Sequence, residues 1–196
     1  MTIRVGIDLD DVLFDTVPAW LKRHNEITGD NVEPEDVKSW DIAQYLNKGS
    51  RDSFFYILQQ SDFWQTVEPV KDAIAYMWKL CTEHDNIEVY VVTSTHYSTT
   101  DKKMRHLYKL FPFLDDMHSV IITGDKYTID LDILVDDNPE NLCMSKKGVV
   151  KVLFDRPHNE WCDVEGIGAL RVYNWKQLYG YITALAWLES EDAIEA

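Results

Sequence analysis

Short apolar segments rich in β-branched residues alternate with helical patterns over the last two thirds of the chain, and this alternation restricts the possible folds most. Strand-like segments cover residues 3–8, 88–93, 119–122, 133–136 and 149–154, with a weaker sixth at 169–173. Helical patterns separate them, notably at residues 70–83 and 98–110. Such alternation predicts an α/β fold with a doubly wound parallel sheet, whose ligand crevice lies at the carboxyl ends of the strands.

Residues 14–69 interrupt the alternation with helix-like pieces at 18–25 and 50–60, a cluster of aromatic residues and no convincing strand. We therefore expect a small helical cap inserted after the first strand and folded over the site. The predicted catalytic core comprises residues 1–13 and 70–188, and the acidic end at 189–196 is expected to be a disordered tail. The 196 residues suffice for one domain of ordinary size with a modest insertion.

Acidic side chains outnumber basic ones by 34 to 19, which gives a formal net charge of -15. This charge repels nucleic-acid backbones and anionic membranes, so we expect a small-molecule substrate and neither polymeric nucleic acid nor a membrane as partner. A small phosphate ester remains compatible with it, because a bound metal and a lysine can reverse the sign of the potential inside a pocket.

The three cysteines, Cys81, Cys143 and Cys162, lack the paired spacing of a disulfide framework or a zinc site. A run of about 18 apolar residues is absent, and so is an export signal. We therefore expect a soluble protein of the reducing cytoplasm. The sequence leaves open whether it acts as a monomer or as a homodimer.

Carboxylates end two of the predicted strands. Asp8 and Asp10 point to the same side of an extended backbone, and Asp136 and Asp137 end a later strand. An Asp-x-Asp pair alone is equally compatible with a turn or a loop cap. If the two strands are neighbours, however, four carboxylates meet, and two unit charges about 4 Å apart repel by ~4 kcal/mol at an effective dielectric constant near ~20. A hard divalent cation relieves this repulsion, and Mg²⁺ suits both oxygen ligands and phosphate.

Two further strand ends carry groups that suit a phosphate. Thr93 and Ser94 supply hydroxyls and backbone N–H groups after the second strand, and Lys126 follows the third. Each residue also has a plain structural interpretation, as a cap of the next helix or as a solvated surface charge. Their order along the chain (acid pair, hydroxyls, lysine, acid pair), each at a strand end, favours a site for phosphoryl chemistry.

With these residues the sequence resembles the haloacid dehalogenase superfamily and, within it, the 5'(3')-deoxyribonucleotidase or 5'-nucleotidase C-type family. The segments that carry the resemblance are Asp8-Leu9-Asp10-Asp11-Val12-Leu13, Val92-Thr93-Ser94-Thr95, Asp125-Lys126, Asp132-Ile133-Leu134-Val135-Asp136-Asp137 and the run Ser61-Asp62-Phe63-Trp64-Gln65-Thr66-Val67-Glu68-Pro69. The resemblance implies a Rossmann-like core with a cap. It also implies that Asp8 is the nucleophile that forms an aspartyl-phosphate, and that Asp10 is the general acid and then the base.

The same resemblance implies the ligand sets. Mg²⁺ would be held by the Asp8 carboxylate, the Asp10 backbone carbonyl and the Asp137 carboxylate, with Asp136 acting through bound water, although the sequence does not settle which of the last two is the direct ligand. The transferring phosphoryl group would be bound by Thr93, Ser94 and Lys126. Asp132 would orient Lys126 or serve as a turn residue, and Arg156 would reach a phosphate or anchor a turn.

The family's nucleobase pocket uses aromatic side chains of the cap. The candidates here are Trp40, Phe63 and Trp64, each of which could instead pack in the core, whereas the aromatic run at 54–56 is expected to pack within the cap. Thr16 stands where the animal members carry an aromatic residue. This departure leaves the base selectivity open.

The predicted function is a Mg²⁺-dependent phosphomonoesterase that acts on (deoxy)ribonucleoside monophosphates through an aspartyl-phosphate. One alternative keeps this chemistry on a sugar phosphate or another small phosphomonoester. A non-catalytic phospho-acceptor domain is disfavoured, because receiver domains lack the insertion and carry their phosphorylated acid on a middle strand. Base, sugar and 5'- versus 3'-phosphate preference are not readable from the sequence.

Overall fold

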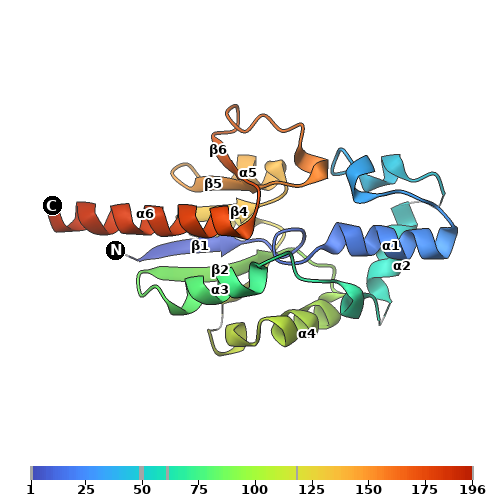
Figure 1. Ribbon diagram of the computed structural model, residues 1–196, viewed down its shortest axis with the longest axis horizontal. Helices are drawn as coiled ribbons and strands as arrows, with labels where there is room; N and C mark the ends of the chain where they lie inside the picture. Colours follow the sequence, from blue (N-terminus) through green and yellow to red (C-terminus); the bar gives the residue numbers. More distant parts are fainter. Residues whose placement is uncertain (1, 49–50, 61, 118, 196) are drawn as a thin grey trace.

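The computed structural model describes residues 2–48, 51–60, 62–117 and 119–195. Within them the chain forms a six-stranded parallel sheet in the order β3-β2-β1-β4-β5-β6 (Figure 1). The strands are β1 (Ile3–Ile7), β2 (Ile87–Thr93), β3 (Val120–Ile122), β4 (Ile133–Asp136), β5 (Val150–Phe154) and β6 (Ala169–Val172). The strand order reverses between β1 and β4, so the switch point where such sheets bind ligands lies between these two strands.

Helices cover both faces of the sheet, which confirms the predicted doubly wound α/β fold. The α-helices are α1 (Thr16–Thr28), α2 (Arg51–Gln59), α3 (Ala73–Thr82), α4 (Thr100–Leu110), α5 (Pro139–Met144) and α6 (Trp175–Glu195). The β1 side chains Val5 and Ile7 pack in the same cluster as Met77 of α3 and Trp175 of α6. Side chains that point to the opposite face of the sheet, such as Leu134 of β4, form a second cluster with Leu142 of α5. Burial on both faces explains why these strands read as continuous apolar runs.

Short 3₁₀ helices complete the structure, mostly in the connections. They are η1 (Pro34–Asp36), η2 (Ile42–Tyr45), η3 (Phe63–Thr66), η4 (Pro112–Met117), η5 (Lys126–Thr128) and η6 (Pro157–Asn159). Within the described part of the chain, none of the helices combines the length and the apolarity that a bilayer crossing requires.

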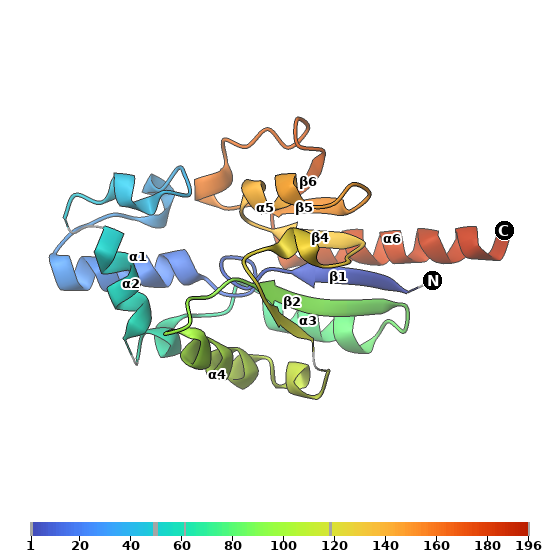
Figure 2. The same ribbon diagram turned by 180° about the vertical axis from the view of Figure 1, so that it is seen from behind.

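The cap lies beyond the carboxyl ends of the strands, where α1, α2 and η1 to η3 form a separate group (Figures 1 and 2). Its two connections to the core run side by side. The Asp15 N–H donates to the Glu68 carbonyl at 2.9 Å, and the Val70 N–H donates to the Leu13 carbonyl at 2.8 Å. The insertion therefore leaves and re-enters the core at one point, next to the end of β1.

The cap has its own internal anchor at Asp30, just after α1. This carboxylate accepts hydrogen bonds from the backbone N–H groups of Asn47 and Lys48 at 2.8 and 3.1 Å and from the Asn47 amide at 3.0 Å. The Asn47 side chain and these N–H groups stabilise the charged form and hold the pKa of Asp30 below its usual range. Asp30 thus fixes the segment that follows η2 against the end of α1.

The end of the chain differs from the expectation of a disordered tail at 189–196. Helix α6 continues through Glu195. Residues 189–195 contain no glycine or proline, and adding residues to an existing helix costs little compared with starting one. Four positions used in the sequence analysis, Met1, Ser50, Ser61 and Ala196, lie outside the described residues.

Candidate active site

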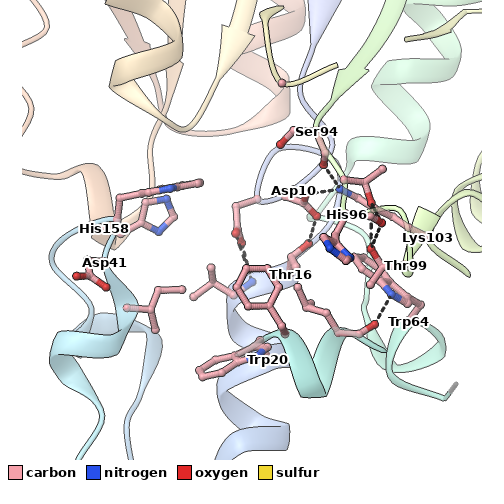
Figure 3. A pocket seen from close by; sticks show the side chains of 18 of the residues that line it. Asp10, Thr16, Trp20, Asp41, Trp64, Ser94, His96, Thr99, Lys103 and His158 are labelled. Carbon is pink, nitrogen blue, oxygen red and sulfur yellow. Dashed lines mark hydrogen bonds and ion pairs between the residues drawn. The ribbon is translucent and has the colours of Figure 1, made fainter. Parts of the chain in front are cut away.

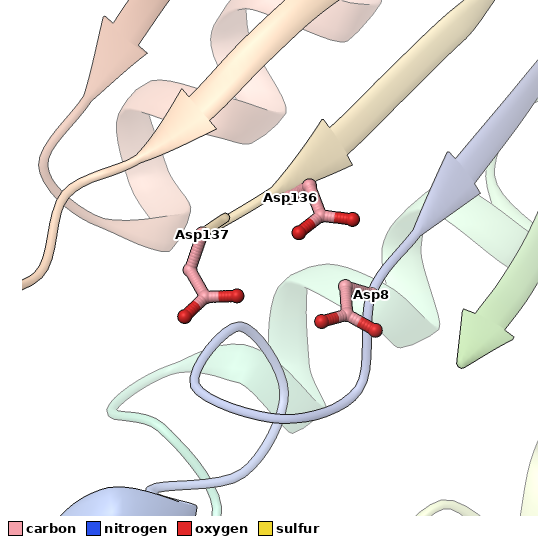
Figure 4. A group of neighbouring side chains, drawn as sticks. All are labelled: Asp8, Asp136 and Asp137. Carbon is pink, nitrogen blue, oxygen red and sulfur yellow. The ribbon is translucent and has the colours of Figure 1, made fainter. Parts of the chain in front are cut away.

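Three buried carboxylates meet at the switch point of the sheet. Asp8 directly follows β1, Asp136 ends β4, and Asp137 follows it (Figure 4). One carboxylate oxygen from each lies within 4.8 Å of the other two. The Asp8 N–H donates to the Val135 carbonyl at 2.9 Å, which extends the pairing of β1 with β4 by one residue. Asp8 of the first predicted acid pair and both acids of the second are therefore neighbours. Asp10 is not part of this cluster of three, because its carboxylate pairs with Lys103 and Thr16.

A tight turn after Asp8 sets the direction of the next acids. The Leu9 carbonyl accepts the N–H groups of Leu13 and Phe14, both at 3.0 Å, and Asp11 adopts a left-handed φ of 55°. The turn presents Asp10 to the large cavity described below and buries Asp11.

Asp11 helps to begin the cap. Its carboxylate accepts the Val17 N–H of helix α1 at 3.1 Å. Burial raises the pKa of Asp11 to about 7, and the attraction of Arg156 only partly offsets this effect.

Lys126 joins one acid of each pair. Its Nζ lies 2.7 Å from Asp8 Oδ1 and 2.7 Å from Asp136 Oδ2, and the side chain is almost fully buried. Burial alone would lower the pKa of Lys126, but Asp8 and Asp136 outweigh this effect and raise it, so the ammonium stays charged. Asp132 takes no part in this contact, because its carboxylate accepts the backbone N–H of Arg4 at 2.8 Å. Asp136 is the acid that orients Lys126.

The charge balance of the cluster fits a hard cation. Burial, and then the neighbouring carboxylates, raise the pKa of Asp8 and of Asp137 well above the usual range despite the attraction of Lys126. Among the described residues, Asp137 Oδ1 is buried and has no hydrogen-bond partner. A buried acceptor without a donor, beside a second buried carboxylate, matches the all-oxygen ligand set that a divalent cation such as Mg²⁺ prefers.

Asp136 differs from Asp137 in how fully it is hydrogen-bonded. Asp136 Oδ1 accepts the Asn138 N–H at 2.9 Å, and both of its oxygens lie 3.1 Å from the Asn141 amide nitrogen. With Lys126 also bound to Oδ2, little acceptor capacity is left for a metal.

The loop around η6 braces Asp137 from the other side. His158 Nε2 lies 2.7 Å from Asp137 Oδ2, and the Asn159 amide donates to the Asp137 carbonyl at 2.8 Å. Arg156 has a structural role, because its Nε donates to the Asp11 carbonyl at 2.5 Å and its Nη1 pairs with Asp15 at 3.0 Å.

Ser94 and His158 lie on different sides of Asp10 (Figure 3). Thr93 ends β2 and is fully buried, whereas Ser94 is exposed and lines the cavity. Lys103 of α4 approaches both of them. Its Nζ donates to Thr93 Oγ1 at 2.9 Å and to the Ser94 carbonyl at 3.1 Å, and it forms an ion pair with Asp10.

A cavity of about 790 Å³ separates the cap from these strand ends (Figure 3). Two of the three aromatic candidates line it: Trp40, which is 48% exposed, and Trp64. Among the described residues, Phe63 does not line the cavity; it is buried beside Trp64, with ring centroids 5.3 Å apart. Phe55 lines it, although the run at 54–56 was expected to pack within the cap, and Trp20 contributes a further ring. The Phe54 side chain lies outside the described residues.

A family model described as "5' nucleotidase, deoxy (Pyrimidine), cytosolic type C protein" matches residues 1–187. The chain belongs to this type C 5'-nucleotidase family. Membership confirms the resemblance read from the four motifs, and it makes the chain a phosphoric monoester hydrolase of the 5'-nucleotidase type.

Named relatives agree with membership in the type C 5'-nucleotidase family, and a solved structure shares the fold. A Clostridium acetobutylicum protein named 5'(3')-deoxyribonucleotidase is 34% identical over 156 residues, which cover 80% of this chain and 83% of the relative. A Bacillus subtilis protein of the same name is 30% identical over 176 residues, with 89% and 95% coverage. A haloacid dehalogenase-like protein of unknown function from Agrobacterium tumefaciens shares the fold, with a TM-score of 0.62, 12% identity and coverage of 95% and 100%.

Two residues of this type C 5'-nucleotidase site were missed from the sequence. Lys103, His106 and Leu107 lie three and four positions apart and are all buried, so the helical periodicity of residues 98–110 already indicates that Lys103 faces inward. His158 had no such signal, because it lies in a loop and meets Asp137 only through the tertiary fold.

Proposed function

We propose that this chain dephosphorylates deoxyribonucleoside monophosphates in a Mg²⁺-dependent reaction that passes through an aspartyl-phosphate on Asp8. The observation that carries the proposal is the buried Asp8 carboxylate at the switch point of the sheet, bound by Lys126 and close to Asp137. The names of the two relatives described above support the substrate class.

The proposed chemistry has two steps. In the first, an Asp8 oxygen attacks phosphorus, the ester P–O bond breaks, and Asp10 gives a proton to the departing nucleoside oxygen. In the second, Asp10 takes a proton from water as that water attacks phosphorus, and Asp8 leaves as a carboxylate. The side chain of Asp10 faces the cavity from which both the nucleoside and water approach, which supports this division of roles.

The phosphoryl group is bound by Lys126 and by the Thr93–Ser94 strand end in this proposal. Mg²⁺ would be held by the carboxylates of Asp8 and Asp137 and by the Asp10 backbone carbonyl, and it supplies positive charge to the phosphoryl oxygens. The unpartnered Oδ1 of Asp137 and the many donors to Asp136 support Asp137 as the direct ligand and Asp136 as the residue that orients Lys126. The role of Asp136 is then to keep the ammonium beside Asp8.

The lining of the cavity supports a nucleobase over a sugar as the leaving group. Indole and phenyl rings from separate cap segments, Trp40, Trp64, Trp20 and Phe55, face the space next to Asp10. Flat aromatic faces suit a base, whereas the ring of a sugar phosphate needs polar partners. Phe63 contributes indirectly, by packing against Trp64.

The test is phosphate release with Mg²⁺ present from dUMP, dTMP, their ribonucleotides and glucose 6-phosphate. We expect turnover of the deoxynucleotides. Trp40→Leu should raise KM by about tenfold because base stacking is lost. Trp78→Leu is the matched control, because Trp78 is similarly exposed (45%) but belongs to α3 and does not line the cavity. Good turnover of the sugar phosphate with none of any nucleotide contradicts the substrate assignment, and an aspartyl-phosphate that accumulates without phosphate release points to the phospho-acceptor alternative.

The same proposal includes the cellular compartment and the division of the chain into a core and a cap. Free Cys81, Cys143 and Cys162 suit a reducing cytoplasm. The paired connections at residues 13–15 and 68–70 support the division into a core of residues 1–13 and 70–188 and a cap of residues 14–69. The net charge of -15 disfavours polymeric nucleic acid as a substrate.

A further inference from the structure

Lys103 is a buried cation outside the four motifs that carry the family resemblance. It belongs to α4, and only 2% of its surface is exposed. Burying an ammonium is costly unless its N–H groups are paired. Its position therefore requires a specific set of acceptors.

The three N–H groups of Lys103 have three acceptors. They are the carboxylate of Asp10, Thr93 Oγ1 at 2.9 Å and the Ser94 carbonyl at 3.1 Å. An ammonium has no further donor to offer, so none remains for a substrate phosphate. The side chain is suited to hold other groups in place and not to bind the substrate itself.

The acceptors belong to two separate strand ends. Asp10 follows β1, whereas Thr93 and Ser94 end β2, and Lys103 reaches both from the helix that comes next in the chain. The other Asp10 oxygen accepts the Thr16 hydroxyl at 2.8 Å. One carboxylate oxygen of Asp10 is thus bound by Thr16 of the cap helix α1, and the other is bound by Lys103 of the core.

The aromatic wall of the cavity contacts the same ammonium. Lys103 Nζ lies 5.6 Å from the ring centre of Trp64, within the range of a cation–π interaction. Trp64 is in turn fixed by the hydrogen bond of its Nε1 to the Leu58 carbonyl at 3.1 Å. Lys103 therefore contacts a fixed side chain of the cap as well as the two strand ends.

We propose that Lys103 is a positioning residue that uses the Thr93–Ser94 strand end as an anchor and holds the Asp10 carboxyl group in one fixed position, so that the proton of Asp10 reaches the departing nucleoside oxygen. The inference rests on the proposed function, because it assigns Lys103 to the acid step of that reaction. It predicts that the effect of losing Lys103 depends on whether the leaving group needs a proton.

The experiment compares dTMP with p-nitrophenyl phosphate, both with Mg²⁺. A nucleoside leaves as a strongly basic alkoxide and needs the proton of Asp10, whereas p-nitrophenolate is a weak base and leaves without it. In Lys103→Met, kcat for dTMP should fall by about 100-fold, as expected for loss of general acid catalysis. The first-turnover release of p-nitrophenolate, followed by stopped-flow absorbance, should stay within about threefold of the wild type, because that step needs no acid.

Two further variants make the comparison decisive. Lys109→Met removes a charge from the exposed face of the same helix and should leave both substrates unaffected. Lys103→Gln keeps a neutral donor at similar reach, should lose less dTMP activity than Lys103→Met, and serves in its place if the methionine variant does not fold by circular dichroism.

The outcomes separate the inference from the proposed function. Equal losses for the two substrates in the folded Lys103 variants, or no loss for either, overturn the positioning role. Asp10→Asn is measured in parallel: if it also affects both substrates equally, the acid role of Asp10 in the proposed function is wrong. If Asp10→Asn discriminates between the substrates and the Lys103 variants do not, only the inference about Lys103 fails.

Discussion

Asp11 is a residue whose ionisation should be visible in the stability of the metal-free protein. Its pKa rises through burial to about 7, above the usual value near ~4 for an aspartate. The folded state therefore binds a proton that the unfolded state has released. The contribution of this group to the free energy of unfolding is therefore full below pH ~4 and is lost as the pH rises through ~7. The loss amounts to up to ~4 kcal/mol, because one pKa unit corresponds to about 1.4 kcal/mol.

Asp11→Asn should remove this dependence and raise the free energy of unfolding at pH 8, because the amide is neutral and its oxygen can still accept the Val17 N–H. Urea unfolding at pH 5 and pH 8 measures the difference, with Asp85→Asn as an exposed control. A variant that is no more stable than the wild type at pH 8 would show that burial does not destabilise the charged Asp11 carboxylate.

His158 should control cation affinity through its contact with Asp137. Its ring nitrogen lies 2.7 Å from Asp137 Oδ2 and leaves Oδ1 free. Removing a partner that orients a metal ligand typically weakens metal binding by about 10–100-fold. We expect a weakening of this size in His158→Ala.

Calorimetric titration of Mg²⁺ into the protein measures this effect. His96→Ala is the matched control, because His96 lines the cavity and its ring nitrogen Nδ1 lies 2.7 Å from Ser98 Oγ, away from the three carboxylates. Equal affinities in His158→Ala and in the wild type would mean that Asp137 does not need this support.

Sequence reasoning was strongest where strand ends carry the chemistry. Asp8, Asp136 and Lys126 could be grouped because parallel strands end at one edge of the sheet. Lys103 and His158 were not predicted, because a lysine on a helix face and a histidine in a loop contact their partners only through the tertiary fold. Asp132 shows the reverse case: proximity in sequence to the acid pair suggested a link to Lys126, and the side chain pairs with Arg4 instead.

At the scale of the element, β1 depends on a glycine at its centre. A Cβ added at Gly6 would clash with the Leu131 side chain and would lie 3.3 Å from Val92 Cγ2. Overpacking of this kind costs about 1–3 kcal/mol, so Gly6→Ala should be destabilised by that amount in urea unfolding.

Gly180 offers the contrasting test. It lies in α6, where an added Cβ meets nothing within 4 Å, so Gly180→Ala should gain about 0.5–1 kcal/mol from helix propensity. If Gly6→Ala is as stable as the wild type or more stable, close packing at Gly6 is not what the strand requires.

The strands could be predicted best where their side chains are buried along the whole strand. All six strands appear within one or two residues of the predicted segments. The inner strands β1, β2, β4 and β5 lie in a sheet covered by helices, whereas the edge strands β3 and β6 are only partly buried, and β6 was the weaker prediction. Adjacent aromatic residues were harder, since the 3₁₀ helix η3 turns Trp64 toward the cavity and Phe63 into the core. The sequence shows two aromatic neighbours and does not show which of them faces the ligand.

At the scale of the whole molecule, the cap contacts the core loop that supports the cation site. Lys38 pairs with Glu160 at 2.8 Å, and Trp40 meets His158 edge to face at 5.2 Å. His158 in turn contacts Asp137. Trp40 of the proposed base pocket thus contacts His158, which contacts the proposed metal ligand Asp137. The insertion therefore contributes to the site as well as covering it.

The central claim is that Asp8 carries the phosphoryl group between the two steps. It is tested most directly by rapid acid quench of the full-length protein with Mg²⁺ and radiolabelled dTMP, followed by peptide mapping. We predict label on the peptide that contains Asp8 within the first turnover, and none in Asp8→Asn, which should fold normally and release no phosphate. Full phosphate release from Asp8→Asn, or label on a peptide without Asp8, would contradict the account.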